Sequence, residues 1–187
     1  MANNDNVFIA NPRAAGSFHR AVKGTALPAD PITDLIAAYK DHGLVSENGF
    51  KNNITRSTTD HKAFGGDVVA SSQDDYAEEW TVELLEHNNL EVLKTTFGEA
   101  NVTTADGVTK VERNKSILPR SVYVVSVQGQ DGGFIRTVLP NAQVTSVGEI
   151  SYTHSGLAVY TLTLKCYAPV GGGSPSFELR EDDEPGS

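Results

Sequence analysis

Apolar and polar residues alternate along much of this chain with a period of two, the spacing that turns one face of a β-strand toward a core. The alternation is clearest where Trp80, Val82 and Leu84 interleave with polar neighbours. Runs rich in valine, isoleucine, tyrosine and threonine, separated by glycine, asparagine and aspartate, extend this interpretation. The predicted strands are Val7–Ala10, Phe50–Thr58, Val68–Leu85, Ala100–Thr104, Val108–Arg113, Ser121–Gln128, Phe134–Leu139, Val144–His154 and Leu157–Tyr167.

Two segments carry helix signals instead. In Asn89–Phe97 an asparagine at 88 or 89 can accept a backbone N–H as N-cap, an acid follows in the first turn, and Gly98 suits the end. This helix is expected to cover a sheet with its apolar face, formed by Leu90, Leu93 and Phe97. A shorter helix-like piece is expected after Asp30-Pro31, ended by Gly43.

The predicted elements define a mainly β fold, a β-sandwich or open barrel with one packed α-helix and extended arms. Glycine-bearing corners at 43–50 and 62–69 bracket a polar extended segment, which indicates a long β-hairpin leaving and re-entering the body. A loop of that length on a small domain usually has a partner. We predict one domain, 1–170, with an N-terminal arm at about 11–27 and a long loop at about 55–67. Residues 171–187 form a glycine-rich hinge and an acidic C-terminal arm.

Charge narrows the range of partners. The formal net charge is −9, from 24 acidic and 15 basic residues. Because phosphate backbones are bound by lysine and arginine that displace counterions, this balance argues against tight binding to nucleic acid. Part of the acidic excess lies in a C-terminal segment that is either a solvated tail or an ordered contact arm. Its acids are Glu178, Glu181, Asp182, Asp183 and Glu184.

Composition also bears on compartment and stability. The single cysteine, Cys166, excludes an internal disulfide, so packing or assembly must hold the fold. No apolar run approaches the ~20 residues that cross a bilayer, and the N-terminus lacks a basic-then-apolar signal. We therefore expect a soluble protein that has no membrane anchor and is not secreted by a signal peptide.

Candidate groups for catalysis or metal binding are few. Asp74, Asp75, Glu78 and Glu79 could offer calcium hard oxygen ligands, but alternate residues of a strand point to opposite faces, which splits this cluster. The five histidines lack metal-ligand spacing, the serines lack a nucleophile elbow, and the glycine runs lack the lysine and helix of a phosphate-binding loop. We predict no catalytic residue, no cofactor and no metal site.

The two corners carry a family resemblance. They read Gly43-Leu44-Val45-Ser46-Glu47-Asn48-Gly49-Phe50 and Lys62-Ala63-Phe64-Gly65-Gly66-Asp67-Val68-Val69. Further pieces in the same order are Val7-Phe8-Ile9-Ala10, Lys23-Gly24-Thr25-Ala26-Leu27-Pro28, Asn89-Leu90-Glu91-Val92-Leu93-Lys94 and Phe97-Gly98. Together they resemble the major tail tube protein of long-tailed, siphovirus-like bacteriophages.

The resemblance implies a structural subunit, not an enzyme, that stacks as hexameric rings into a hollow conduit for genome ejection. Its main partner would be itself, joined by other tail proteins such as the tape measure and the tail terminator. Double-stranded DNA would pass through without specific binding. The subunit would be made in the host bacterial cytoplasm and would function in the virion tail.

On this interpretation the long loop reaches an adjacent ring, with Phe64 as its apolar anchor; burial of Phe64 under its own loop is the alternative. The predicted inter-ring contacts are Thr58, Asp60, His61, Lys62, Phe64, Gly65, Gly66 and Asp67. The predicted arm contacts are Asn11, Pro12, Phe18 and Thr25, and the C-terminal segment 174–184 is a further contact arm. The polar strand face of Glu79, Thr81 and Glu83 would line either the channel or the outside of the tube.

Two other classes of function compete with a tube subunit. A β-sandwich adhesin or carbohydrate-binding module would require an exposed cluster of tryptophan and tyrosine, whereas the only tryptophan, Trp80, lies in a core-like alternation. An enzyme would require a hidden carboxylate pair such as Asp75 and Glu79. Rings or tubes of the purified protein would favour the first class over both.

Overall fold

The computed structural model describes residues 7–12, 16–130 and 132–181. Its elements are β1 (Ala10–Pro12), β2 (Phe18–Val22), β3 (Lys40–Asp41), β4 (Val45–Lys62), β5 (Val68–Leu84), α1 (Leu90–Phe97), the 3-10 helix η2 (Glu99–Asn101), β6 (Val102–Ala105), β7 (Val108–Val111), β8 (Ser121–Gly129), β9 (Phe134–Val147), β10 (Tyr160–Cys166) and β11 (Phe177–Arg180). This mainly β fold with one α-helix in the described residues confirms the predicted fold class.

One antiparallel sheet organises the body, with strand order β3-β2-β8-β9-β10-β5-β4. β1 adds to β8 and β11 adds to β9, while β6 and β7 form a separate hairpin. The turn of that hairpin is Asp106-Gly107, where both residues have positive φ (51° and 76°), as the predicted two-residue turn requires.

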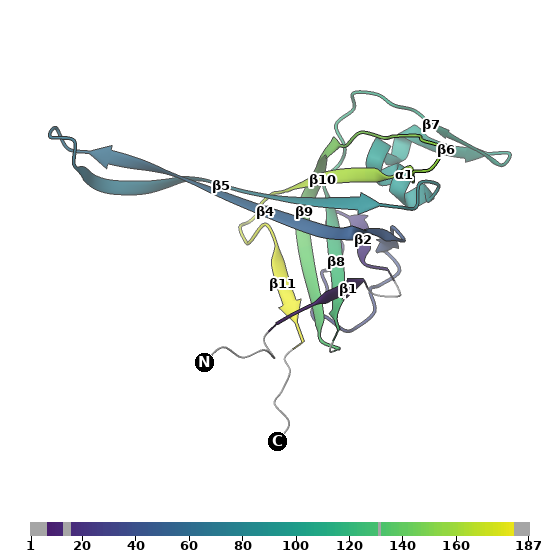
Figure 1. Cartoon of the computed structure of the whole chain (residues 1–187), viewed down its shortest axis with the longest axis horizontal. Helices are drawn as coiled ribbons and strands as arrows, with labels where there is room; N and C mark the ends of the chain where they lie inside the picture. Colours follow the sequence, from purple (N-terminus) through teal and green to yellow (C-terminus); the bar gives the residue numbers. More distant parts are fainter. Residues whose placement is uncertain (1–6, 13–15, 131, 182–187) are drawn as a thin grey trace, which may run out of the picture.

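β9 folds the sheet onto itself. Its first half pairs with β8 and β11, and its second half pairs with β10. The pairing with β8 shifts register near Pro140, a residue that has no N–H to donate to a ladder. As Figure 1 shows, β8, β9 and β11 therefore cross β10, β5 and β4 at a steep angle.

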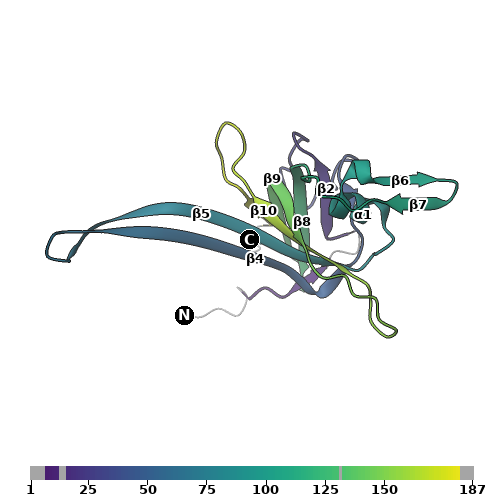
Figure 2. The ribbon, with the colours of Figure 1, turned by 90° about the horizontal axis from the view of Figure 1, so that it is seen from above.

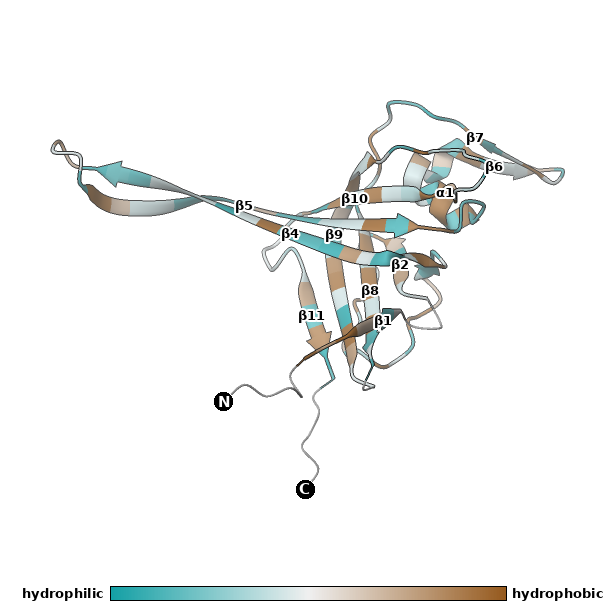
Figure 3. Ribbon diagram, in the orientation of Figure 1, coloured by the Kyte–Doolittle hydropathy of each residue, from teal (hydrophilic) through white to brown (hydrophobic). Residues whose placement is uncertain are grey.

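The main core fills the space between the two crossing halves. It is built from β2, β5, β8, β9 and β10, together with α1 and the start of β6, and its members include Phe18, Val82, Leu84, Tyr123, Leu139, Leu162 and Leu164. Figure 3 shows the corresponding brown bands along the strands of the body. The apolar positions predicted for the Trp80–Leu84 alternation thus do face the core.

Helix α1 lies where the sequence places it, but its buried face differs. The Asn89 side chain accepts the backbone N–H of Glu91 at 2.9 Å, and Gly98 at the C-cap has a φ of 97°. The buried residues are Val92, Leu93, Thr95 and Thr96, whereas Leu90 is 37% exposed. The threonines can turn inward because their hydroxyls find partners, as in the 2.7 Å bond from Thr96 to the Val92 carbonyl.

A second, smaller core covers the outer face of β2, β8 and β9. The segment 26–39 lies over this face without forming a helix. The prediction of a helix-like piece after Asp30-Pro31 is therefore wrong. Asp30 instead closes a local turn, in which its carboxylate accepts the backbone N–H groups of Ile32 and Thr33. Buried Arg136 on β9 fixes the turn by donating to the carbonyls of Asp30 and Thr33, each at 2.8 Å.

Two other segments differ from expectation. Residues 18–22 form strand β2, paired on both sides, where an irregular arm was expected. The hairpin expected around Ser155-Gly156 is a loop from 148 to 159, because β9 ends at Val147 and β10 begins at Tyr160. Leu157 is accordingly 74% exposed.

His42 is buried beside Phe18 and α1, and its two hydrogen bonds fit a neutral ring. Nδ1 donates to the Lys40 carbonyl at 3.0 Å, and the Thr95 hydroxyl donates to Nε2 at 2.7 Å. The same hydroxyl accepts from the Arg20 guanidinium at 3.4 Å. Burial lowers the pKa of His42 to about 3, and the positive charge of Arg20 acts in the same direction.

Stability should therefore fall in mild acid. The unfolded chain takes up a proton near pH 6.5 and the folded chain only near pH 3, so this site's contribution is complete above pH 6.5 and shrinks as pH falls. At pH 5 the free energy of unfolding should have dropped by about 2 kcal/mol. Urea titrations from pH 7 to pH 5 measure it. In His42→Gln the free energy of unfolding should no longer fall between pH 7 and pH 5. In the control His154→Gln, at an exposed position, it should still fall. An equal fall in both variants would show that His42 does not cause it.

Candidate assembly interface

The distal part of β4 and β5 forms a two-stranded ribbon that projects from the body. We define the ribbon as residues 55–75. β10 accompanies β5 only as far as Glu78, and beyond that point the two strands pair with each other alone. Figures 1 and 2 show the ribbon extending well past the rest of the molecule. Because isolated two-stranded ribbons are marginally stable in water, a ribbon of this length is expected to be covered by a partner.

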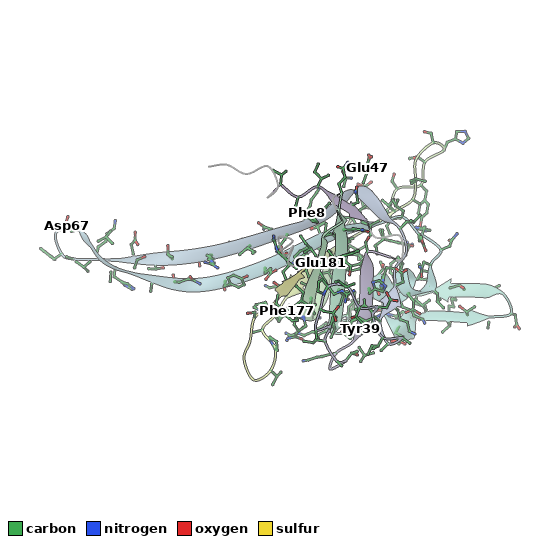
Figure 4. All side chains as sticks on the ribbon, turned by 90° about the horizontal axis from the view of Figure 1, so that it is seen from below. Phe8, Tyr39, Glu47, Asp67, Phe177 and Glu181 are labelled. Atoms are coloured by element: carbon green, nitrogen blue, oxygen red, sulfur yellow. The ribbon has the colours of Figure 1, made fainter. Side chains whose placement is uncertain are left out.

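The ribbon ends in a tight turn at Phe64. The Ala63 amide donates to the Asp67 carbonyl and the Gly66 amide donates to the Ala63 carbonyl, each at 2.8 Å, with Gly66 at a φ of 94°. This geometry leaves the Phe64 side chain fully exposed at the tip, so it is not buried under its own loop. Figure 4 shows its neighbour Asp67 at the extremity, far from the labelled residues of the body.

Polar side-chain contacts join the two strands of the ribbon. On one face Thr59 donates to Asp74, Ser72 donates to the same carboxylate at 3.1 Å, and His61 Nε2 lies 3.1 Å from the Ser72 hydroxyl. The segment predicted as a loop at 55–67 is thus strand up to Lys62, with register shifts after Ser57 and after His61. All eight predicted inter-ring residues lie on the ribbon or its turn and are exposed: Thr58, Asp60, His61, Lys62, Phe64, Gly65, Gly66 and Asp67.

The root of the ribbon is anchored by Glu78, which is only 1% exposed. Its carboxylate accepts from Trp80 Nε1 at 2.8 Å and from the Tyr76 hydroxyl at 3.1 Å. The Asn52 amide of β4 and the Ser176 hydroxyl, at 3.2 and 2.7 Å, complete the set. Sequence reasoning considered Glu78 only as a metal ligand; the aromatic and polar residues at alternate positions around it were the signal for an internal acceptor.

Glu79, Thr81 and Glu83 lie on the opposite face of β5, as the alternation predicts. Their cross-strand neighbours on β4 and β10 include Asn53 and Lys165 beside Glu79, and Lys51 and Thr163 beside Thr81. The face is therefore polar over three strands, with two lysines near the two glutamates. The charge of this face is therefore balanced, although the net charge of the chain is −9.

The four predicted arm contacts divide in two. Asn11 and Pro12 belong to β1 at the edge next to β8, and Thr25 lies in a turn where its amide and hydroxyl donate to the Val22 carbonyl. Phe18, by contrast, has no exposed surface and stacks on Tyr123 with ring centroids 5.6 Å apart. Its side chain belongs to the core of its own chain, because β2 carries it inward, and cannot reach a neighbouring subunit.

The described part of the C-terminal segment is integrated into the sheet. β11 pairs with residues 135–138 of β9, Phe177 packs on the smaller core, and Ser176 binds Glu78. Gly171, Gly172 and Gly173 precede it with φ values of 97°, 93° and 122°. The acids Asp182, Asp183 and Glu184 lie outside the described residues.

Other kinds of site find little support in the described part of the chain. It holds no group of three or more histidine, cysteine or carboxylate residues arranged to bind a metal ion. Trp80 is partly buried and bonded to Glu78, so it does not form an exposed sugar-binding platform. None of the helices there has the length and hydropathy to cross a membrane.

The chain is thus a mainly β protein with a long, exposed ribbon. The chain belongs to the phage tail tube protein family, whose model matches residues 1–184. It is therefore a structural subunit of a phage tail tube. No curated protein matches the sequence.

Two solved structures are similar to the whole chain. The tube-terminating cap of the anti-feeding prophage has a TM-score of 0.48 and 12% identity, over 97% of this chain and 100% of that one. A protein of the sheath–tube complex of an extracellular contractile injection system, in its extended state, has a TM-score of 0.44 and 13% identity, over 95% and 98%.

Proposed function

We propose that this subunit assembles into hexameric rings that stack into a hollow tube, with the ribbon bridging each ring to the next. The observation that carries the proposal is the ribbon, whose strands contact only each other beyond Glu78 and whose tip exposes Phe64. Family membership supplies the class of assembly. The tape measure and tail terminator would be its further partners, in a virion tail assembled in the bacterial host.

Open sheet edges support the ring. β4 is the last strand of the sheet, and Val144–Val147 of β9 pairs on one side only, with β10. An unpaired edge is a template for another strand, and in a closed ring each edge is satisfied by the neighbouring subunit. The face carrying Glu79, Thr81 and Glu83 would then continue from subunit to subunit around the axis.

Concentration-dependent assembly tests this function. The purified full chain should be monomeric when dilute, because ordered contacts must first offset the entropy of association, and should form uniform hollow tubes when concentrated. Size-exclusion chromatography and negative-stain microscopy measure both states. Monomers at every concentration would overturn the proposal.

We further propose that the Glu79 face lines the channel. Replacing Glu79 and Glu83 with lysine would shift the charge of a six-subunit ring by roughly 24 units toward positive, next to Lys51 and Lys165. Tubes should still form. They should retain DNA and slow genome release, with a defect that shrinks as salt screens the charges.

Release of DNA from virions carrying each variant, measured at low and high salt, tests the lumen assignment. Glu99→Lys with Glu149→Lys makes the same charge change at exposed positions outside this face and should leave release unchanged. Normal release from the Glu79/Glu83 variant would place that face on the outside of the tube.

A further inference from the structure

A pocket lined by aromatic rings lies at the end of the molecule opposite the ribbon tip. We call it the aromatic pocket, and its volume is about 370 Å³. α1, the β6–β7 hairpin and the loop before β10 contribute its walls. Its lining includes His87, Phe97, Thr109, Arg113, Tyr152 and Tyr160.

The rings of this pocket hold one another in fixed orientations. His87 stacks on Tyr160 with centroids 4.5 Å apart, and Phe97 meets the same ring edge-on at 5.6 Å. Tyr152 lies edge-on to His87 at 5.5 Å, and both tyrosine hydroxyls lie within 3.3 Å of His87 Nε2. Such a preformed box favours a further aromatic ring, because it offers both faces and edges. A benzene-sized ring needs roughly 150 Å³, so the volume is sufficient.

Phe64 is an exposed aromatic side chain that such a pocket could bury. It is fully exposed, and the ribbon carries it away from its own body, so only another molecule can cover it. Figures 1 and 2 both place the ribbon tip and the β6–β7 hairpin at opposite ends. A contact between opposite ends of identical subunits is heterologous and repeats without limit, as the stacking of rings requires.

Charge favours the aromatic pocket over the other large cavity of the molecule as the site that contacts a ribbon. The ribbon carries Asp60, Asp67, Asp74 and Asp75 against Arg56 and Lys62. Residues 110–120, which lead away from the aromatic pocket, carry Lys110, Arg113, Lys115 and Arg120 against Glu112, an unusual basic stretch in an acidic protein. The Arg113 guanidinium lies 5.2 Å from the Phe97 ring centre, in the pocket wall.

The alternative receptor is an apolar groove of about 470 Å³ between the start of β4 and strands β8 and β9. Its lining includes the acids Glu47 and Glu178, which would face the aspartates of an incoming ribbon. The groove is therefore the poorer match by charge.

We propose that the aromatic pocket of one subunit receives Phe64 from the ribbon of a second copy of this chain. The proposal rests on the proposed function, since it identifies the surface that the ribbon contacts in the next ring. Arg113 lies where it can attract the aspartates that flank the tip, and the rings of the pocket bury the phenylalanine.

Engineered cysteines test the contact directly and leave Phe64 in place. Cys166 is buried, and burial raises the pKa of its thiol to about 12, so new surface cysteines are the reactive ones. Ala63→Cys, mixed with heavy-isotope-labelled Thr109→Cys and treated with a short bismaleimide, should give mixed dimers in tubes and none in dilute monomers. Ala63→Cys mixed with Ser46→Cys, at the rim of the groove, is the matched control and should give none.

Filling the pocket gives a second test. Thr109→Trp should abolish tube growth, whereas Thr103→Trp, which pairs with Lys110 on the other face of the same hairpin, should permit it. Tubes in which Ala63→Cys links to Ser46→Cys, or fails to link to Thr109→Cys, would overturn the pocket as receptor and leave the tube function intact. Failure of the unmodified chain to form tubes would refute the tube function, and this proposal with it.

Discussion

Replacing Phe64 with alanine should abolish tube growth and leave the melting temperature of the monomer nearly unchanged. The side chain is fully exposed in the isolated subunit, so its removal costs the folded monomer no packing. In an assembled tube the phenyl group of Phe64 would be desolvated. Interface aromatics often contribute about 2 kcal/mol or more to the free energy of association. A loss of that size at every ribbon would accumulate around a ring, which makes this the largest assembly effect expected from a single exposed residue.

Negative-stain microscopy and light scattering measure growth, and differential scanning fluorimetry measures the monomer. Val108→Ala is the matched control, because Val108 is a large exposed apolar residue beside the turn of the other hairpin. It should leave both growth and melting temperature unchanged. Unfolding of the Phe64→Ala monomer would show that the side chain packs within its own chain.

Local sequence signals predicted the elements that depend on few residues. The alternation around Val82 sets the two faces of β5, and Asn89 caps α1. The two-residue turn Asp106-Gly107 connects β6 and β7. In each case the determining groups lie within a few positions of one another. The ribbon turn belongs to this class too, since the glycines after Phe64 mark it.

Elements that depend on distant partners were missed. β2 has few strong strand formers and is stabilised by pairing with β3 and β8, which sequence alone does not reveal. The length of β9 was hidden by Pro140, where the sheet bends. At 30–39, Asp30-Pro31 imitates a helix start, but the bonds from Arg136, more than a hundred residues away, stabilise a turn.

The same distinction applies to the candidate sites. The exposed position of Phe64 follows from its neighbours in the chain, so the sequence could indicate it. The aromatic pocket could not be predicted, because His87, Phe97, Arg113 and Tyr152 meet only after the sheet has folded. The role of Glu78 as a buried acceptor could not be predicted for the same reason, since one of its donors, Ser176, lies 98 positions away.

Removing the Glu78 carboxylate should destabilise the subunit more than any other single change at the ribbon root. In Glu78→Ala the Trp80 indole, the Tyr76 and Ser176 hydroxyls and the Asn52 amide all lose their acceptor in a partly buried site. Hydrogen bonds to a charged acceptor contribute about 1.5–3 kcal/mol each, and water can replace some of those lost here. We expect the free energy of unfolding to fall by about 3 kcal/mol, or roughly 6–12 °C in melting temperature for a chain of this size.

Glu79→Ala is the matched control, one residue along the same strand and on the opposite face, and should change stability by no more than about 0.5 kcal/mol. Chemical denaturation measures both variants. Hydrogen exchange adds a readout specific to the network: because Ser176 ties the C-terminal segment to Glu78, the amides of β11 should lose protection in Glu78→Ala before the core strands do. Equal destabilisation by the two substitutions, or unchanged protection of β11, would show that the carboxylate does not join the ribbon root to the C-terminal strand.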